Sequence, residues 1–385
     1  MYTINPKLNT LYCLRCGAEF PISDYYTGCP LCFKENYPAN LSFHYRGRRN
    51  FRQGQKRMLR YTDFLPYESF PTLGEGGTPV VELKTLAQKY HLNAVYTKNE
   101  FQNPTGSHKD RMSPFSVARA VSLHKKCVVA ASSGNAGASL AAYAAAASIP
   151  CKIISTKNIN PVWKRAIELT GAQLILTETA GDRWILMKQM VEEENWYPVT
   201  NFINPPVGSN PFGIQGYKTI AYEIHDDFMG KIPSFIVVPT ARGDLIWGIF
   251  EGFKDLYEMN LIQHIPKIVA VEPFPRISRV LKGEDYRNIF PGNSSSTTSI
   301  GGNTVTYQVV KAINNSKGSA ISICQNDVLE NQKDLAQIGL YLESSSATVS
   351  GALAKLIENK TIPPESDVLL IATSNGYKDS PVCTK

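Results

Sequence analysis

The sequence predicts an α/β protein in which parallel sheets are covered by helices on both faces. One observation supports this fold class, and a second bears on the number of domains. Short apolar runs that suit buried strands alternate with longer segments of helical character, and this alternation is typical of parallel sheets flanked by helices. With 385 residues, of which 43% are hydrophobic and 19% charged, the chain is also long enough for two globular domains.

The expected elements alternate along the chain. Strands are expected at residues 128–131, 151–155, 172–177, 234–238, 268–271, 320–324 and 368–371. Helices are expected at residues 114–126, 136–147, 162–169, 182–194 and 347–358, with another after Asp244. The stretch 283–303 is rich in Ser, Thr, Asn and Gly, which predicts a loop.

Composition argues against a membrane protein and gives no sign of export. The sequence contains no run of about 18 apolar residues, and its first seven residues lack the charged-then-apolar pattern of a secretion signal. We therefore expect a cytoplasmic protein. The net charge of +7 is accompanied by a basic stretch from Arg46 to Arg60. A solvated connector is preferred there over a nucleic-acid surface, so no nucleic-acid partner is expected.

Four of the eight cysteines form two Cys-x-x-Cys pairs, Cys13 with Cys16 and Cys29 with Cys32, and 12 residues separate the pairs. This spacing suits a tetrahedral structural zinc ion, because each pair can bind the metal from one short turn. Unmetallated thiols are the alternative, and disulfides fit a reducing compartment less well. We interpret residues 1–45 as a zinc-ribbon-like segment, which is too short to hold a core without metal.

The stretch from Asn103 to Arg111 carries the strongest chemical signal. A turn containing Pro104 and Gly106 leads to Lys109, and a helix-compatible run follows. A lysine at a loop-to-helix junction is a candidate for Schiff-base chemistry, because a partly buried ammonium loses its proton more easily. A solvated surface lysine is the alternative.

These nine residues resemble the cofactor-lysine segment of fold-type II pyridoxal-phosphate (PLP) enzymes, particularly threonine synthases, whose pattern is N-P-T-G-S-F-K-D-R. The resemblance implies that Lys109 carries PLP as a Schiff base and acts as general base. It also implies the two-domain α/β fold of the tryptophan synthase β-subunit and a homodimer. A large PLP-binding domain would comprise residues 46–112 and 205–385, with a smaller α/β domain, residues 113–204, inserted in it.

The segment from Ser132 to Gly137 lies between an expected strand and an expected helix. Small side chains and backbone N–H groups at a helix start suit an anion, and a helix-capping turn is the alternative. The segment resembles the S-S-G-N-x-G loop that binds the α-carboxylate of the substrate in this family. The resemblance implies that Asn135 also contacts the cofactor and that the substrate-binding residues are Ser132, Ser133, Gly134, Asn135 and Ala136.

Two further segments resemble cofactor-binding segments of the family. Thr373 matches a threonine that meets the pyridine nitrogen of PLP. Residues 238–244 replace a V-P-x-G-N-x-G loop that binds the cofactor phosphate, but here the loop carries Arg242 in place of a small residue and a carboxylate at Asp244. Such a carboxylate opposes an anion unless it turns away or pairs with Arg242.

His108 offers a compensation for this altered loop. It stands where threonine synthases have Phe, and tryptophan synthase β-subunits carry His at this position near the cofactor phosphate. We therefore hypothesise that His108 and Arg242 hold the phosphate, together with Gly243.

Other departures concern the substrate. Gln215 and Tyr217 replace Glu and Gln in a segment that otherwise resembles I-E-G-Q-K-T, a segment interpreted mostly as helix packing. Ser299 falls where many threonine synthases read R-I-G-N-P, so an arginine suited to a phosphate is missing. These changes weaken the case for O-phosphohomoserine as substrate.

The expected function is that of a threonine-synthase-like lyase acting on an amino acid with a β- or γ-leaving group. Conversion of O-phosphohomoserine to threonine and phosphate is the first hypothesis. A β-replacement synthase or a serine/threonine dehydratase is the alternative within this fold. A catalytically silent PLP-fold protein that binds a partner is the alternative of another class.

Overall fold

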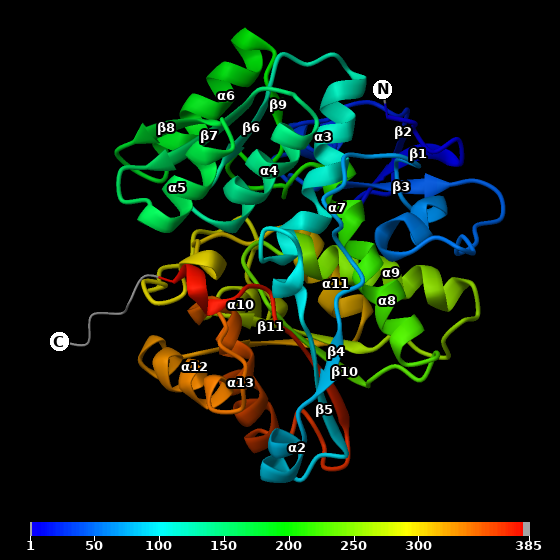
Figure 1. Ribbon diagram of the computed structural model, residues 1–385, viewed down its shortest axis with the longest axis vertical. Helices are drawn as coiled ribbons and strands as arrows, with labels where there is room; N and C mark the ends of the chain where they lie inside the picture. Colours follow the sequence, from blue (N-terminus) through cyan, green and yellow to red (C-terminus); the bar gives the residue numbers. More distant parts are fainter. Residues whose placement is uncertain (1, 380–385) are drawn as a thin grey trace. The chain divides into compact units, whose positions relative to one another are not determined.

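The computed structural model describes residues 2–379 (Figure 1). The chain divides into two compact units, which we describe separately. Unit 1 comprises the chain up to Gly77 together with Lys109–Thr219, and unit 2 comprises Thr78–His108 together with the chain from Ile220 onward. The finer division predicted from the sequence, into residues 1–45, 46–112 with 205–385, and 113–204, stays a prediction.

Unit 1 begins with a small antiparallel sheet. Its strands lie in the order β2-β1-β3, and their bounds are Leu8–Cys13 (β1), Glu19–Phe20 (β2) and Leu41–Tyr45 (β3). The short helix α1 (Pro30–Lys34) lies between β2 and β3 in the chain. Cys29 caps this helix, because its side chain accepts a hydrogen bond from the backbone N–H of Cys32.

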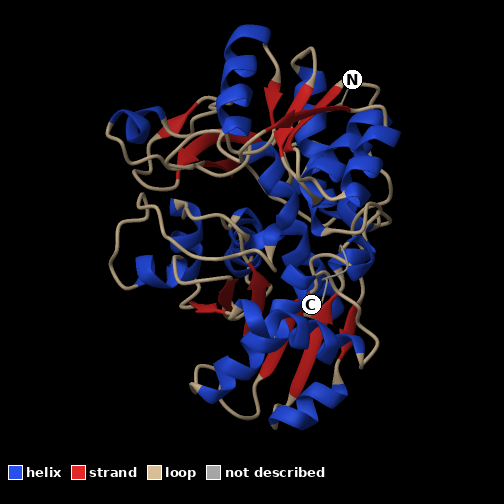
Figure 2. Ribbon diagram, turned by 90° about the vertical axis from the view of Figure 1, so that its left-hand side faces the viewer, coloured by secondary structure: helices blue, strands red, loops and turns tan. Residues whose placement is uncertain are grey.

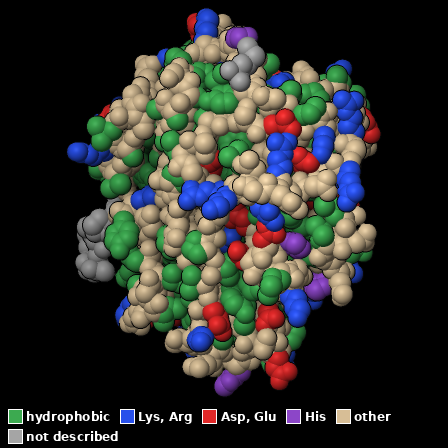
Figure 3. All heavy atoms as spheres, turned by 45° about the vertical axis from the view of Figure 1, so that its right-hand side comes forward, with side chains coloured by type: hydrophobic (Ala, Val, Ile, Leu, Met, Phe, Trp, Pro, Cys, Tyr) green, Lys and Arg blue, Asp and Glu red, His purple; other side chains and the backbone are tan. Residues whose placement is uncertain are grey.

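The basic stretch after this sheet is used in the fold of unit 1. Arg52 bonds to the carboxylate of Asp63, and the guanidinium of Arg49 lies 4.8 Å from the ring centre of Phe64. Both partners belong to the 3₁₀ helix η1 (Arg57–Phe64). On the face that Figure 3 shows, Lys and Arg side chains lie among Asp and Glu side chains. These contacts support the interpretation of the stretch as a connector.

The second sheet of unit 1 is parallel and has the order β8-β7-β6-β9. Its helices are α3 (Ser113–Ser122), α4 (Asn135–Ala146), α5 (Pro161–Leu169) and α6 (Asp182–Glu194), and its strands are β6 (Val128–Ala131), β7 (Cys151–Thr156), β8 (Gln173–Thr177) and β9 (Tyr197–Pro198). Val129 and Ile154 pack with Met187 of α6 on one face of this sheet. Ile153, one residue along β7, points to the other face and meets α4 at Gly137.

Unit 2 is built on a six-stranded sheet with the order β12-β11-β10-β13-β5-β4. All neighbouring strands are parallel except the edge strand β4. The strands are β4 (Val80–Glu82), β5 (Ala94–Lys98), β10 (Phe235–Pro239), β11 (Lys267–Glu272), β12 (Ser319–Ser322) and β13 (Asp367–Ile371). Figure 2 shows these strands with helices around them.

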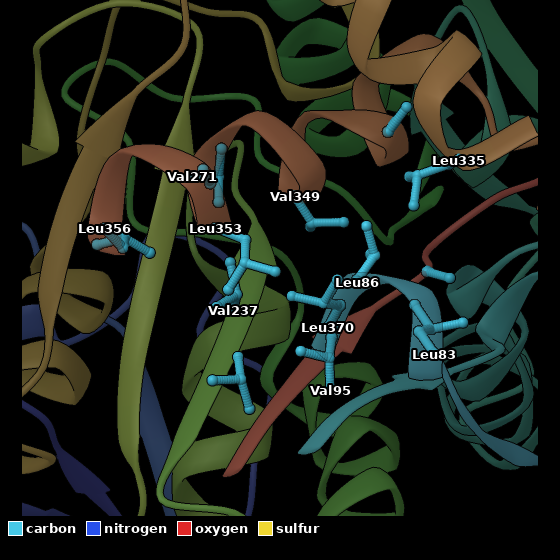
Figure 4. Packing of buried hydrophobic residues seen from close by; sticks show 14 of the residues in the cluster. Leu83, Leu86, Val95, Val237, Val271, Leu335, Val349, Leu353, Leu356 and Leu370 are labelled. Atoms are coloured by element: carbon cyan, nitrogen blue, oxygen red, sulfur yellow. The ribbon is translucent and has the colours of Figure 1, made fainter. Parts of the chain in front are cut away.

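The core of unit 2 lies between one face of this sheet and three helices (Figure 4). Val95, Val237 and Leu370 of three strands pack against Leu86 of α2 and Leu353 of α13. Helices α9 and α11 also contact β11. The helices with residues in unit 2 are α2 (Lys84–Tyr90), α8 (Lys218–Asp227), α9 (Asp244–Glu258), α10 (Ile277–Leu281), α11 (Tyr307–Asn315), α12 (Val328–Ala336) and α13 (Ser344–Glu358).

The predicted α/β class with parallel sheets flanked by helices is confirmed. Each predicted strand is present within two residues of its expected bounds. The helix expected over residues 114–126 ends earlier, at Ser122, and His124 then adopts a left-handed backbone with φ of 51°. The expected loop 283–303 contains only the short 3₁₀ helix η5 (Thr298–Ile300). No helix in residues 2–379 is long and apolar enough to cross a membrane.

Candidate active site

In unit 2, three predicted cofactor segments follow neighbouring parallel strands. The strands β5, β13 and β10 lie side by side. His108 lies in the segment after β5, Thr373 follows β13, and the loop from Thr240 to Gly243 follows β10. Because the carboxyl ends of parallel strands share one edge of a sheet, the topology brings these segments to the same edge. Ligands of α/β proteins typically bind at such an edge.

Thr373 is held by its backbone and presents its hydroxyl. Its N–H donates to the Oγ of Ser346 at 2.8 Å, and its carbonyl accepts from the backbone N–H of His108 at 3.0 Å. Among residues 2–379, the Thr373 hydroxyl has no hydrogen-bond partner. A hydroxyl without a protein partner, held at the carboxyl end of a strand, suits a hydrogen bond to a ring nitrogen.

The loop before α9 has the backbone of an anion-binding turn. Gly243 precedes this 15-residue helix with φ of 86°, a left-handed conformation that favours glycine. A Cβ at Gly243 would lie 2.3 Å from Val309 Cβ, so the site also excludes a side chain for lack of space. The carboxylate of Asp244 accepts a hydrogen bond from the amide of Gln308. One oxygen of this carboxylate, which the sequence predicts beside an anion site, is thus bound to Gln308.

In unit 1, the amine of Lys109 lies beside a buried tyrosine. Lys109 belongs to the 3₁₀ helix η3 (His108–Arg111), which leads into α3. Its Nζ donates to the hydroxyl of Tyr217 at 3.3 Å, and Tyr217 is fully buried. Gly216 brings the two segments together, because a Cβ there would lie 1.8 Å from the carbonyl oxygen of Arg111. The predicted loop-to-helix lysine is thus held in a defined polar contact.

The predicted substrate loop of unit 1 links the end of β6 to the start of α4. The Oγ of Ser132 accepts from the backbone N–H of Gly137 at 3.0 Å and from that of Gly134 at 3.3 Å. The Oγ of Ser133 accepts from the Oγ of Ser155 and from the guanidinium of Arg183, each at 2.9 Å. Two serines therefore stabilise this turn in different ways. Ser132 binds a backbone N–H in the first turn of α4, and Ser133 joins the loop to β7 and α6.

The four N-terminal cysteines converge in unit 1. Their sulfurs lie within 4.8 Å of one another, with 3.6 Å between those of Cys13 and Cys32 and 3.8 Å between those of Cys16 and Cys29. Zinc–sulfur bonds of about 2.3 Å in a tetrahedron give sulfur separations of about 3.8 Å, so this donor set fits a zinc ion. Burial raises the pKa of Cys13 and of Cys29, so a cation must displace their protons to bind.

Each unit, taken by itself, carries groups of the kind that hold PLP. Unit 1 has the amine of Lys109, and unit 2 has the hydroxyl of Thr373 and the glycine turn before α9. These groups and the α/β fold define the class of protein. A profile of the pyridoxal-phosphate dependent enzyme family matches residues 71–374. The chain therefore belongs to this family of PLP-dependent enzymes.

Similar proteins include curated threonine synthases. The threonine synthase of Methanosarcina acetivorans is 29% identical over 96% of this chain and 92% of its own length. That of Methanocaldococcus jannaschii is 29% identical over 95% of this chain and 92% of its own length. Among solved structures, a fungal L-serine ammonia-lyase from Rhizomucor miehei has a TM-score of 0.67 at 20% identity and covers 80% of this chain and 95% of its own. The fold predicted for fold-type II enzymes, and the likeness to threonine synthases, are confirmed.

Sequence reasoning missed two contacts of the site. The sequence predicts helix packing for the segment of Tyr217, although the replacement of a family Gln by Tyr217 is a signal. Nothing in the sequence neighbourhood of Arg183 marks it, because only the fold brings it to Ser133, 50 residues earlier.

Proposed function

We propose that this protein is a threonine-synthase-like lyase that converts O-phospho-L-homoserine and water to L-threonine and phosphate. The similarity to threonine synthases over nearly the whole chain carries the proposal, because it includes the cofactor-lysine stretch and the substrate loop. When bound, PLP supplies a ring that stabilises negative charge at the carbon beside the amino group. Lys109 would act as the general base that moves a proton at that carbon.

The residues proposed to hold PLP are those that the sequence predicts. Lys109 would provide the covalent attachment, and Asn135 a polar contact from the start of α4. Thr373 would meet the ring nitrogen, and a neutral hydroxyl there does not fix the proton on that nitrogen as a carboxylate would. The proposed phosphate-binding residues are His108, Arg242 and Gly243.

The substrate would be held through its α-carboxylate by residues 132–136. The loop offers small side chains and the start of the 12-residue helix α4, which favours a negative charge. Ser132 and Ser133 are already fixed by hydrogen bonds, so little ordering is needed when a substrate binds.

Three further properties belong to this proposal. Zinc bound by Cys13, Cys16, Cys29 and Cys32 would stabilise the N-terminal sheet. The protein would act in the cytoplasm, and it would form a homodimer. Neither a nucleic-acid nor a membrane partner is proposed.

The proposal is tested with purified protein supplied with PLP and O-phospho-L-homoserine. Release of phosphate in equal amount with L-threonine supports it, and the variant K109A should then release neither. Release of 2-oxobutanoate from L-threonine, or of pyruvate from L-serine, would instead make the protein a dehydratase if no phosphate is released from O-phospho-L-homoserine. Exchange of the leaving group of O-acetyl-L-serine for an added thiol would make it a β-replacement synthase. Failure to retain PLP would favour the silent binding protein.

A further inference from the structure

Arg183 reaches the substrate loop from a separate element of unit 1. It lies in the first turn of α6, and its Nη1 donates to the Oγ of Ser133 at 2.9 Å. Its Nε donates to the carbonyl of Ala180 at 3.3 Å. Two nitrogens of the guanidinium are thereby held by hydrogen bonds, and one of the two acceptors, Ser133, belongs to the proposed substrate site.

The charge of Arg183 has no acidic partner within residues 2–379. No carboxylate there lies within ion-pair distance of its guanidinium, and its two acceptors are a hydroxyl and a carbonyl. Arg119 in the same unit shows the usual arrangement, since it forms a two-bond pair with Asp24. Burial lowers the pKa of the Arg183 guanidinium, which reflects the cost of holding its charge partly away from water.

No neighbouring carboxylate neutralises this charge, and the guanidinium keeps N–H donors that a ligand could use. A guanidinium has five N–H donors in a plane, and Arg183 uses two of its nitrogen atoms in the contacts above. A Cβ at Gly134 would lie 3.8 Å from the indole of Trp163, so an aromatic ring also borders the loop. A loop of small residues bordered by a cation suits an anionic ligand.

We propose that Arg183 is a substrate-binding residue, which gives its positive charge to an anionic oxygen group of the substrate beside Ser133. The group is either the α-carboxylate or the phosphate of the leaving group, since both offer oxygens that a guanidinium can bind in pairs. The inference rests on the proposed function in one respect: the loop 132–136 must contact the amino-acid substrate.

Three ligands distinguish the two groups. O-phospho-L-homoserine carries both, L-homoserine carries only the carboxylate, and 3-aminopropyl phosphate carries only the phosphate. Their dissociation constants would be measured on the PLP-loaded parent and on the variant R183Q from the absorbance change of the cofactor after rapid mixing, before O-phospho-L-homoserine is turned over. A lost charge-assisted hydrogen bond should weaken the affected ligands by about 10- to 100-fold, and R183K should recover part of the loss.

Two control variants separate binding from structure. R165Q removes an exposed arginine of α5 and should leave all three affinities unchanged. S155A removes the other donor to Ser133 and so loosens the loop without touching the charge of Arg183. If Arg183 only supports the loop, S155A and R183Q should weaken the same ligands to the same extent.

Selective weakening of the two carboxylate ligands, beyond that caused by S155A, assigns Arg183 to the carboxylate. Selective weakening of the two phosphate ligands assigns it to the leaving group. Unchanged affinities, equal losses in S155A and R183Q, or a parent that binds none of the three ligands would each overturn the inference. Failure of the proposed function looks different: the parent would bind L-homoserine, with R183Q weaker, but release no phosphate from O-phospho-L-homoserine.

Discussion

The backbone N–H of His108 donates to the carbonyl oxygen of Thr373 at 3.0 Å, and the Nδ1 of the same imidazole lies 3.4 Å from that oxygen. One of these residues was assigned from sequence to the cofactor phosphate and the other to the ring nitrogen. The backbone bond fixes both at one edge of the sheet in unit 2. It does not depend on the imidazole, so the side chain can be replaced without removing it.

The variant H108F should therefore keep the fold but bind PLP more weakly. Phenylalanine preserves the ring volume and removes the nitrogens that can donate to a phosphate, for an expected loss of about 10-fold in affinity. The measurement is titration of PLP-free protein with PLP, followed by absorbance of the bound cofactor. Equal affinity of parent and variant would remove His108 from the phosphate site.

Tyr217 offers a cleaner substitution, because Y217F removes only the hydroxyl that contacts Lys109. The ring should stay, since it is fully buried, with the lysine Nζ 5.6 Å from its centre. Loss of the hydroxyl removes one restraint on the amine, so turnover should fall by about 10-fold with little change in KM. In the PLP-free protein, Lys109 should also react faster with an amine-labelling reagent.

The control is Y197F, which removes another buried tyrosine hydroxyl of unit 1 at its contact with Asp24. If both variants change turnover equally, the effect of Y217F is general loosening of unit 1. An unchanged labelling rate in Y217F would show that the hydroxyl does not restrain the amine.

Features of the site that are local in sequence can be predicted from it, whereas contacts between distant segments cannot. Strands and their carboxyl-end loops are local in sequence, so alternation and motifs predict the loops that contain residues 132–136, residues 238–244 and Thr373. Contacts between elements distant in sequence have no local signature. The pairing of Asp244 with Gln308 follows from the packing of α9 against α11, and that of Arg183 with Ser133 from the packing of α6 against β6 and β7. The residue pattern reveals neither.

A similar limit applies to a buried arginine of unit 2. Arg276 is fully buried and donates to the carbonyls of Thr240 and Ile300 at 2.8 and 2.9 Å. It thus ties the loop after β10 to the predicted loop 283–303. From the sequence it is an unremarkable residue, because only the fold supplies backbone acceptors around it.

Removing the metal proposed for the N-terminal sheet should affect Lys109. Strand β3 contacts the segment of Tyr217, because Gln215 donates to the Oγ of Ser42 at 3.1 Å and accepts from the hydroxyl of Tyr45 at 3.2 Å. Metal analysis should find about one zinc per chain. Chelation should lower both the melting temperature and turnover, and zinc should restore them.

The variant C32S tests the same link without a chelator and should reproduce both losses. A protein that is purified without metal and is insensitive to chelation would contradict the proposed zinc site. A loss of melting temperature with full turnover would keep the zinc site and disprove its link to Lys109.

Gly243 should tolerate no side chain. In G243A the new Cβ would lie 2.3 Å from Val309 Cβ, and the residue would also have to keep a left-handed backbone. The loop should therefore shift, with a loss of about 1–3 kcal/mol in stability and weaker PLP binding. G171A is a matched control, because Gly171 has φ of 84° but nothing within 4 Å of its Cβ position. Unfolding and PLP titration of both variants separate the clash with Val309 from backbone strain. Equal losses of stability in G243A and G171A would show that the clash adds nothing.

Asp63 makes the stability of unit 1 depend on pH. Burial alone would raise the pKa of its carboxyl, but hydrogen bonds from Lys7 and Arg52 outweigh burial and lower the pKa below its ordinary value. A lowered pKa in the folded state contributes stability above the unfolded pKa of about 4, and this contribution is lost as the pH falls through the folded pKa. At pH 7, D63N should therefore lower the free energy of unfolding by about 1–3 kcal/mol.

As the pH falls through the lowered pKa of the folded parent, its carboxyl is protonated too, and the difference between parent and D63N should shrink. Urea unfolding at several pH values measures it. The control is D182N, which replaces a half-buried carboxylate that accepts from the N–H of Thr179 and forms no ion pair among residues 2–379. A D63N deficit that persists unchanged at low pH would show that the lost stability comes from packing. The ion pairs with Lys7 and Arg52 would then contribute nothing measurable.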